Sequence, residues 1–447
     1  MNGQQSTWFP RHPQDSVRHR PLNRQARGGL NMWSVSRIAP TVGGIFAVIG
    51  LVAMPSFADA ATVDKRWVLV ADGVSNQARP SFTQDSVDSP VNRCSYDPGV
   101  AVLWTQASPS GQSIMSRTIG ECSNRLLAPQ IRLSGWQRLS QDPITKRNLN
   151  WDLIAAGVEP SPGASGQSWP GAGFLNLFSD DRRIRLTASD QAVDSHGQAA
   201  AINPGFAGND EVIYVFTQGQ SVKLQRRVPT AELAGTDAIV NPGNGARVYR
   251  PAVAAAASIS SDVGWVAWYA DGPRPGIMAR KFKMGSSGTT FDKGLTAPGS
   301  ALANGRVPNQ RLALANTSRP LPEFPYATVG RTWLSYPTET NKGHQVRVWN
   351  FGTSKHIDIP TRKRPRHVSS AVGFDGRLWL GWVQGRRAVI AQANKSITKV
   401  TIKHRVEMPN GPIRSLNVAA TRPSQRAITQ VHLATNAGGS IYLHRFQ

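Results

Sequence analysis

One short pattern recurs along the sequence, and a repeat constrains the fold more than any single residue can. Its clearest copy is RPAVAAAASISSDVGWVAWYADGPRPGIMARKF at residues 250–282. This copy contains a segment of small residues, a segment with Trp265 and Trp268, a turn rich in Gly and Pro, and a further apolar segment. Apolar residues alternate there with the period of two that β-strands require. The unit is therefore predicted to consist of antiparallel strands.

Hairpins of this kind can be placed at seven positions, namely residues 99–120, 172–188, 211–228, 264–282, 331–350, 376–394 and 426–446. Strands of small residues precede several of them, as at 199–203, 367–374 and 413–420. Units of about 50 residues with four strands are typical of propeller blades. The sequence therefore predicts an all-β fold, a seven-bladed β-propeller. Six or eight blades remain alternatives because the second copy follows the first at a long interval and precedes the third at a short one.

The two ends of the repeat region are expected to meet. The last copy ends at Phe446, which leaves the fourth strand of its blade unassigned. The apolar segment KRWVLV at residues 65–70 belongs to no copy. We expect this N-terminal strand to complete the last blade, so that no sheet edge stays open. Residues 61–447 are then a single β-propeller domain.

Residues 1–60 are typical of an N-terminal extension followed by a signal peptide. Six arginines precede or enter an apolar core of 13 residues at 42–54, and small residues before Ala58 and Ala60 suit cleavage there. Met32 is an alternative translation start. An uncleaved anchor is the other interpretation, but a spanning helix needs about 20 apolar residues. We expect a periplasmic or secreted chain that does not span the membrane after cleavage.

Cys94 and Cys122 are the only cysteines. They flank the first hairpin, and a turn near residues 107–111 would place them almost opposite each other. In an oxidising compartment we expect a disulfide between them, with a free pair as the alternative. Two cysteines are too few for a Cys₄ zinc site. No metal site and no cofactor are predicted.

The chain is strongly basic, with a formal net charge of +24, of which +20 belongs to residues 61–447. Arginine outnumbers lysine 39 to 12, and guanidinium groups suit carboxylate, sulfate and phosphate oxygens, although GC-rich coding produces the same bias. The densest basic run consists of Arg362, Lys363, Arg364, Arg366 and His367. It is the candidate ligand-binding site, and a merely solvated loop is the alternative. Binding there should fall steeply with salt.

A second basic pattern recurs in the expected third strand of most blades. Its members are Arg117, Arg185, Arg226, Arg280, Arg347 and Arg445, with Gln392 in the sixth copy. These guanidinium groups either lie on the outer blade surface and pair with a neighbour, or face a groove that binds a polyanion. The first use is favoured because third strands lie far from the propeller axis.

Short strings in the repeats resemble a known family. The PAVA strand at 251–254, the string DGRLW at 375–379 and the looser DVGW at 262–265 are similar to repeats of bacterial secreted β-propellers of the sialidase-like, Asp-box kind. The Asp-box itself, Ser-x-Asp-x-Gly-x-Thr-Trp, occurs in no copy. The resemblance would imply an Arg triad, an acid Asp and a Tyr–Glu nucleophile pair, and none of these is assigned to a residue of this chain.

The sequence contains no motif for a known catalytic centre, since H-E-x-x-H, G-x-S-x-G and P-loop patterns are absent. No catalytic residue is nominated. The first hypothesis is an exported, non-enzymatic propeller that binds an anionic glycan, an envelope polymer or a protein partner. The alternatives are a hydrolase or lyase acting on an acidic polysaccharide in the axial funnel, and a periplasmic assembly scaffold. We expect a monomer without specific nucleic-acid recognition.

Overall fold

The computed structural model describes residues 67–76, 78–84, 99–108, 111–120, 131–132, 144–147, 152–158, 171–176, 183–185, 195–202, 211–227, 237–241, 246–255, 262–271, 275–285, 288–300, 312–316, 331–373, 376–408, 410–421 and 430–446. All of them belong to the unit Ala60–Gln447. The expected signal segment and the pair Cys94 and Cys122 lie outside the described residues, and their predictions stay untested. This part of the chain contains no helix with the length and hydrophobicity of a membrane span.

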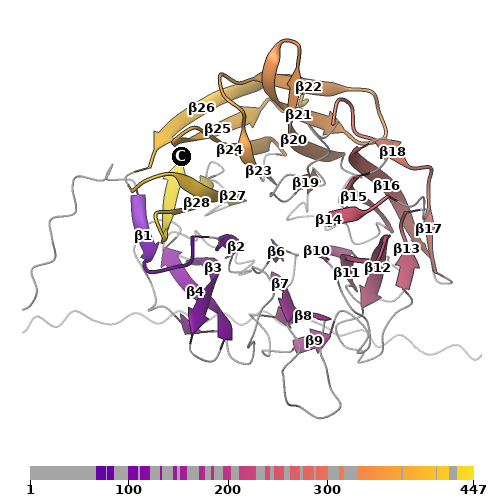
Figure 1. Ribbon diagram of the computed structural model, residues 1–447, viewed down its shortest axis with the longest axis horizontal. Coiled ribbons are helices and arrows are strands. Elements are labelled where there is room, and N and C mark those ends of the chain that lie inside the picture. Colours follow the sequence, from indigo (N-terminus) through magenta and orange to yellow (C-terminus); the bar gives the residue numbers. More distant parts are fainter. Residues whose placement is uncertain are drawn as a thin grey trace, which may run out of the picture. The chain divides into compact units, whose positions relative to one another are not determined.

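The described residues are all β, as predicted, and form seven antiparallel sheets. The first three sheets contain β2 (Ser81–Gln84), β3 (Gly99–Ser108), β4 (Gly111–Gly120) and β5 (Ile131–Arg132); β6 (Ile144–Arg147), β7 (Asp152–Val158), β8 (Gly171–Asn176) and β9 (Arg183–Arg185); and β10 (Ser195–Ile202), β11 (Glu211–Gln218), β12 (Ser221–Arg227) and β13 (Asp237–Ile239). Within each of these sheets, neighbours in sequence are neighbours in space (Figure 1).

The fourth, fifth and sixth sheets follow the same rule. They contain β14 (Val248–Ala255), β15 (Val263–Ala270), β16 (Gly276–Gly285), β17 (Gly288–Phe291) and β18 (Leu295–Thr296), which also pairs with β16; β19 (Ala313–Asn316), β20 (Thr332–Thr340), β21 (Gly343–Asn350) and β22 (His356–Pro360); and β23 (Arg366–Val372), β24 (Leu378–Gln384), β25 (Arg387–Ala393) and β26 (Val400–Glu407). Consecutive four-stranded meanders of this kind are the usual units of propellers.

The seventh sheet joins both ends of the described chain. Its strand order is β1-β29-β28-β27, from β1 (Trp67–Ala71), β27 (Ile413–Thr421), β28 (Gln430–Ala437) and β29 (Ser440–Phe446). Trp67 lies opposite His444 and Leu69 opposite Tyr442 in the β1–β29 ladder. The expected pairing between the N-terminal strand and the last hairpin is therefore present, and Figure 1 shows indigo β1 close to the yellow strands at the C-terminal end of the chain.

Neighbouring sheets touch through their first strands. β2 contacts β6, β6 contacts β10, and the series continues through β14, β19 and β23 to β27, which in turn contacts β2. The small residues of these strands, such as Ala252 and Ala254 of β14, are buried. Small side chains allow close approach of the strands, which explains why segments such as 251–254 carry almost nothing larger than valine.

The predicted hairpins are present, but the one at residues 172–188 is not the middle hairpin of its sheet. β8 and β9 are the third and fourth strands of their sheet, and the middle hairpin is β7 with β8. Residues 152–158, DLIAAGV, contain no aromatic residue and stand before a long connection, so the sequence pattern missed β7. With β7 included, the second strands begin at residues 99, 152 and 211, which removes the irregular interval.

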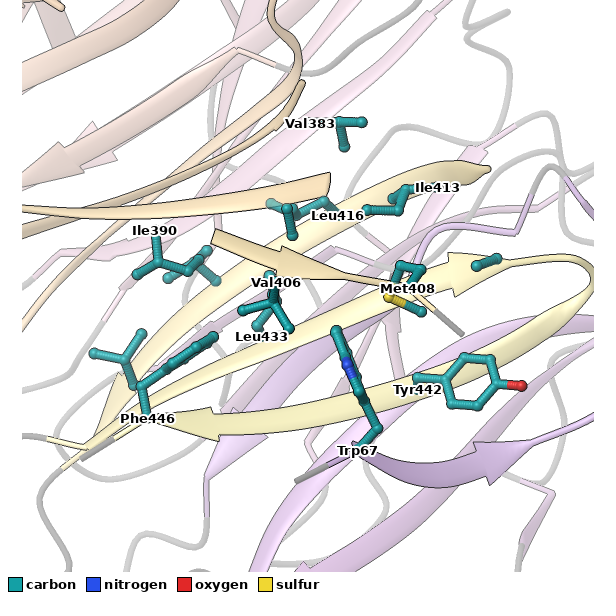
Figure 2. Packing of buried hydrophobic residues seen from close by; sticks show 14 of the residues in the cluster. Trp67, Val383, Ile390, Val406, Met408, Ile413, Leu416, Leu433, Tyr442 and Phe446 are labelled. Carbon is teal, nitrogen blue, oxygen red and sulfur yellow. The ribbon is translucent and has the colours of Figure 1, made fainter. Parts of the chain in front are cut away.

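The core lies between sheets, and alternate residues of one strand enter two different cores. On β15, Val266 and Trp268 pack with residues of the preceding sheet, whereas Ala267 and Tyr269 pack with residues of the next. The string GWVAWYA is apolar on both faces for this reason. Figure 2 shows a further core, where Trp67 of β1 packs near Tyr442 and Met408, with the Trp67 and Tyr442 ring centroids 6.3 Å apart.

Candidate functional site

Register shifts occur in the first strands β10, β14, β23 and β27, and in two of them a basic residue has a positive φ. The register shifts between Tyr249 and Ala252 of β14, and between Arg366 and Ser369 of β23. At these bulges Arg250 has a φ of 49° and His367 a φ of 51°. Side chains other than glycine rarely adopt positive φ, and a bulge redirects the side chain that it carries. Both basic side chains therefore depart from the ordinary alternation of their strands.

A third basic residue lies at the corresponding place before β2. Arg79 and Pro80 directly precede β2, as Arg250 and Pro251 occur at the start of β14. The segment is anchored by the seventh sheet, since the Ser415 hydroxyl and the Asn436 amide each donate to the Ala78 carbonyl at 2.9 Å. These hydrogen bonds fix the backbone from which the Arg79 side chain projects.

Arg79 interacts electrostatically with both of the other residues, although those two belong to different sheets. Burial is the main cause that lowers the pKa of the Arg250 guanidinium, and the positive charge of Arg79 lowers it further. Burial also lowers the pKa of His367 to about 4, and Arg79 and Arg366 act in the same direction. Arg79 is therefore close enough to influence both groups. We call Arg79, Arg250 and His367 the basic cluster.

The protonation states of the basic cluster follow from these shifts. At pH 7 the imidazole of His367 is neutral, because its pKa lies near 4. The two guanidinium groups stay charged, since arginine keeps its proton in proteins. The cluster thus offers two forked cations and one neutral ring that can either donate or accept a hydrogen bond.

The basic run predicted from sequence is divided between two places. Arg362, Lys363 and Arg364 are exposed on the connection between β22 and β23. Arg366 is also exposed but belongs to β23, whereas His367 is half-buried and part of the basic cluster. The alternative of a simple solvated loop therefore does not describe the whole run.

Sequence reasoning missed Arg79 and Arg250, although a signal for them exists. Each stands before a proline at the start of a first strand, in the strings ARPSF and YRPAV. A comparison of the positions just before each small-residue strand would have aligned them. The site was instead predicted at residues 362–367 because basic residues are most concentrated there in the sequence.

The recurrent third-strand arginines connect neighbouring sheets. Arg117 donates to the Val70 carbonyl at 2.7 Å, Arg280 to Val240 at 2.6 Å and Arg347 to Pro298 at 2.8 Å. Each acceptor lies in the last strand of the preceding sheet or directly after it. Arg226 instead donates forward to Gly285 at 3.1 Å. The structural use of these arginines therefore agrees with the geometry better than a polyanion groove.

Two of the predicted positions need correction. Arg185 lies in β9, a fourth strand, and is not equivalent to the others. Arg347 does not lie on the surface, because its side chain is 9% exposed. Its Nε and Nη2 atoms donate to the two Asp358 carboxylate oxygens at 2.5 and 2.7 Å. This bidentate contact lowers the pKa of Asp358, while the same contact raises the pKa of Arg347.

Among the residues that the structure describes, no three His, Cys, Asp or Glu side chains gather as a metal ion would require.

Comparison with known proteins gives a likeness of fold alone. No protein-family model and no curated protein matches the sequence. The structure resembles the β-propeller domain of the Trilobed protease from Pyrococcus furiosus (7% identity, 82% of this chain and 94% of that chain, TM-score 0.44). It also resembles an ulvan lyase of a new polysaccharide lyase family (12%, 85% and 95%, TM-score 0.47) and a leech intramolecular trans-sialidase (11%, 85% and 69%, TM-score 0.40).

Proposed function

We propose that this chain is a closed seven-bladed β-propeller that binds an acidic polysaccharide at the basic cluster, as a binding protein rather than an enzyme. The architecture is supported by the seven consecutive sheets, the contacts between their first strands, and the β1–β29 pairing. The binding function rests on one observation, which is that Arg79 lies near enough to Arg250 of β14 and to His367 of β23 to influence the pKa of both.

The chemistry of the cluster suits a carboxylate or sulfate group on a sugar. A guanidinium group presents parallel N–H donors that match two anionic oxygens, and such charge-assisted bonds are stronger than neutral ones. Partial burial strengthens them further because the local dielectric constant is lower than in water. The neutral His367 imidazole would then contact a sugar hydroxyl without repelling a second cation.

The location is part of the same proposal. Residues 1–60 would direct the chain to the periplasm or the exterior, where acidic polysaccharides of envelopes and matrices are accessible. A net charge of +20 on the exported part would attract such polymers over a long range at low salt.

Binding can be tested with the chain that begins at residue 61. Polygalacturonate supplies carboxylates, dextran sulfate supplies sulfates, and dextran is the neutral control. We expect binding to at least one acidic polymer, falling steeply between about 50 and 200 mM salt. The double variant Arg79→Gln/Arg250→Gln should bind at least tenfold more weakly.

A matched control removes two charges elsewhere. Lys403 and Arg405 are exposed on the outer strand β26, so Lys403→Gln/Arg405→Gln should change affinity less than twofold. Equal binding of dextran, or equal loss in the two double variants, would contradict a site at the basic cluster.

Lyase activity on an acidic polysaccharide is a second candidate. It is favoured by His367, a neutral base at pH 7 within the influence of Arg79, because proton removal beside a carboxylate needs a base and a neutralising cation. We rank it second because catalysis also needs an acid at a defined distance, whereas binding needs only the charges. Release of unsaturated uronates, detected by ultraviolet absorbance and lost in His367→Asn, would establish it and end the binding-only proposal.

A further inference from the structure

Exposed cations continue outward from the basic cluster along one end of the sixth sheet. Arg366, next to His367 in β23, lies opposite Val383 at the end of β24. The following turn is closed by the pair Gln384 and Arg387, so it lies at the same end of the sheet. Arg366 therefore stands between the cluster and this turn.

The β22–β23 connection is held against that turn. In the amide orientation that satisfies its surroundings, the Gln384 side-chain oxygen accepts from the backbone N–H groups of Arg362 at 2.7 Å and Lys363 at 3.1 Å. The Lys363 stem lies over Gly385, where an added Cβ would meet its Cδ at 3.7 Å. Pro365, two residues after Lys363, is buried. The exposed cations thus project from a fixed backbone.

Six side chains form what we call the basic path, namely Arg362, Lys363, Arg364, Arg366, Arg386 and Arg387, all of them exposed. Arg387 lies 3.5 Å from Glu407, whose side chain is 59% exposed, and such surface pairs contribute little. The other five take part in no ion pair between described residues. The path crosses strands β23 to β25, a width of about 10 Å at the usual strand spacing.

The described surface favours recognition by charge. Its exposed large hydrophobic residues are Leu69 and Ile239, so the described residues of this exposed class include no aromatic ring. Proteins that bind single-stranded nucleic acid combine a basic groove with such rings. Guanidinium and ammonium groups alone suit a polymer with regularly spaced carboxylates or sulfates.

We infer that the basic path extends the site at the basic cluster, so that a linear acidic polysaccharide is bound from the cluster outward across the end of the sixth sheet. This inference rests on the proposed function and adds to it the class of ligand, a chain of several acidic sugars rather than one terminal sugar. Affinity should therefore increase with chain length.

The test compares digalacturonate with polygalacturonate on the chain beginning at residue 61. The triple variant Lys363→Gln/Arg364→Gln/Arg386→Gln changes only exposed side chains and should fold normally. We expect it to bind the polymer at least tenfold more weakly, with a smaller salt dependence, and to bind the disaccharide within twofold of the unchanged chain. Arg250→Gln should weaken binding of both ligands.

The outcomes separate the two proposals. If the triple variant keeps full affinity for the polymer while Arg250→Gln loses it, the path is overturned and the basic cluster remains. If neither variant loses affinity, the proposed function fails as well. Double-stranded DNA bound as tightly as the polymer, with the same loss in the triple variant, would assign the path to nucleic acid and overturn the inference.

Discussion

Buried histidines are the groups through which this protein should respond to acid. His432 of β28 is 1% exposed, and burial, followed by the charge of Arg445, lowers its pKa from 6.5 to about 3. The pKa of His367 is lowered to about 4. Both folded-state values lie below the unfolded value, so the native state favours the neutral rings.

The sign of the pH dependence follows from these shifts. Between pH 6.5 and about 4 the unfolded chain binds protons that the folded chain does not, so the free energy of unfolding should fall as the pH falls. Each histidine contributes a slope of up to about 1.4 kcal/mol per pH unit. Asp358, whose pKa is lowered below 3.8, reduces the free energy of unfolding only at a still lower pH, where its carboxylate becomes protonated.

Chemical denaturation at a series of pH values measures this slope. The variant His432→Phe keeps a ring beside Phe82. Its free energy of unfolding should depend less steeply on pH between pH 6.5 and 4, by an amount that corresponds to at most one bound proton. An unchanged slope in the variant would show that His432 does not titrate on unfolding in this range.

At the residue scale, the sequence predicted charge but not geometry. The run at residues 362–367 was found because its cations are adjacent in the chain. The turn of His367 away from that run depends on a bulge with positive φ, and strand alternation contains no signal for a bulge. The influence of Arg79 on both Arg250 and His367 depends on the arrangement of the sheets, which no local pattern reveals.

At the scale of elements, contacts between sheets depend on a few polar links and close approaches. The Arg347 guanidinium bonds Asp358 within its own sheet and the Pro298 carbonyl after the fourth sheet. The Tyr336 hydroxyl donates to the same carbonyl at 2.6 Å. The Arg347 side chain therefore links two sheets at a place to which water has little access.

Arg347→Met should lower the free energy of unfolding by about 2 kcal/mol, because Asp358 loses its partner in a partly buried place. Arg387→Met is the matched control, since the side chains of Arg387 and Glu407 are 58% and 59% exposed, and it should cost less than about 0.5 kcal/mol. Equal effects of the two substitutions in denaturant titrations would contradict the role of Arg347.

Gly381 of β24 lies where the sixth and seventh sheets approach each other closely. A Cβ at this position would lie 2.3 Å from Val418 Cγ2 and 3.0 Å from Leu416 Cδ2. Gly381→Ala should therefore cost about 1–3 kcal/mol through overpacking. Gly294→Ala, where nothing lies within 4 Å of an added Cβ, should leave the melting temperature nearly unchanged. A melting temperature of Gly381→Ala equal to that of Gly294→Ala would contradict this packing.

Sequence patterns predicted elements well where both faces of a hairpin are apolar. The Trp-rich strands β15 and β24 are examples, because alternate residues enter two cores. β7 was missed since it contains no aromatic residue and its partner β8 follows only after residue 170. Short outer strands such as β5 and β18 consist of two residues and carry too few side chains for any period to be detected.

At the scale of the whole molecule, β1 provides the link between the ends of the chain. The Val74 N–H donates to the Gly439 carbonyl at 2.7 Å, and the Ser440 hydroxyl donates to Asp72 at 2.6 Å, so the segment after β1 is also bound to the last hairpin. This Asp72 contact lowers the pKa of its carboxyl group. The pairing of β1 with β29 was predictable from the sequence, because the apolar segment at residues 65–70 belonged to no repeat and the last blade lacked its fourth strand.

A chain beginning at residue 72 should melt at a much lower temperature than one beginning at residue 61, and should aggregate through the exposed edge of β29. Trp67, which is 7% exposed, would also leave the core. Leu69→Ala is the control, because Leu69 is 46% exposed and its loss should change the melting temperature little. Identical melting of the two chains would contradict a closing role for β1.

The central claim, that acidic polysaccharide binds at the basic cluster of Arg79, Arg250 and His367, can be tested by hydrogen exchange on the chain beginning at residue 61. With saturating polygalacturonate, we predict slower exchange of backbone amides at the starts of β2, β14 and β23. Slower exchange confined to other strands, or unchanged exchange in the presence of bound polymer, would contradict the claim.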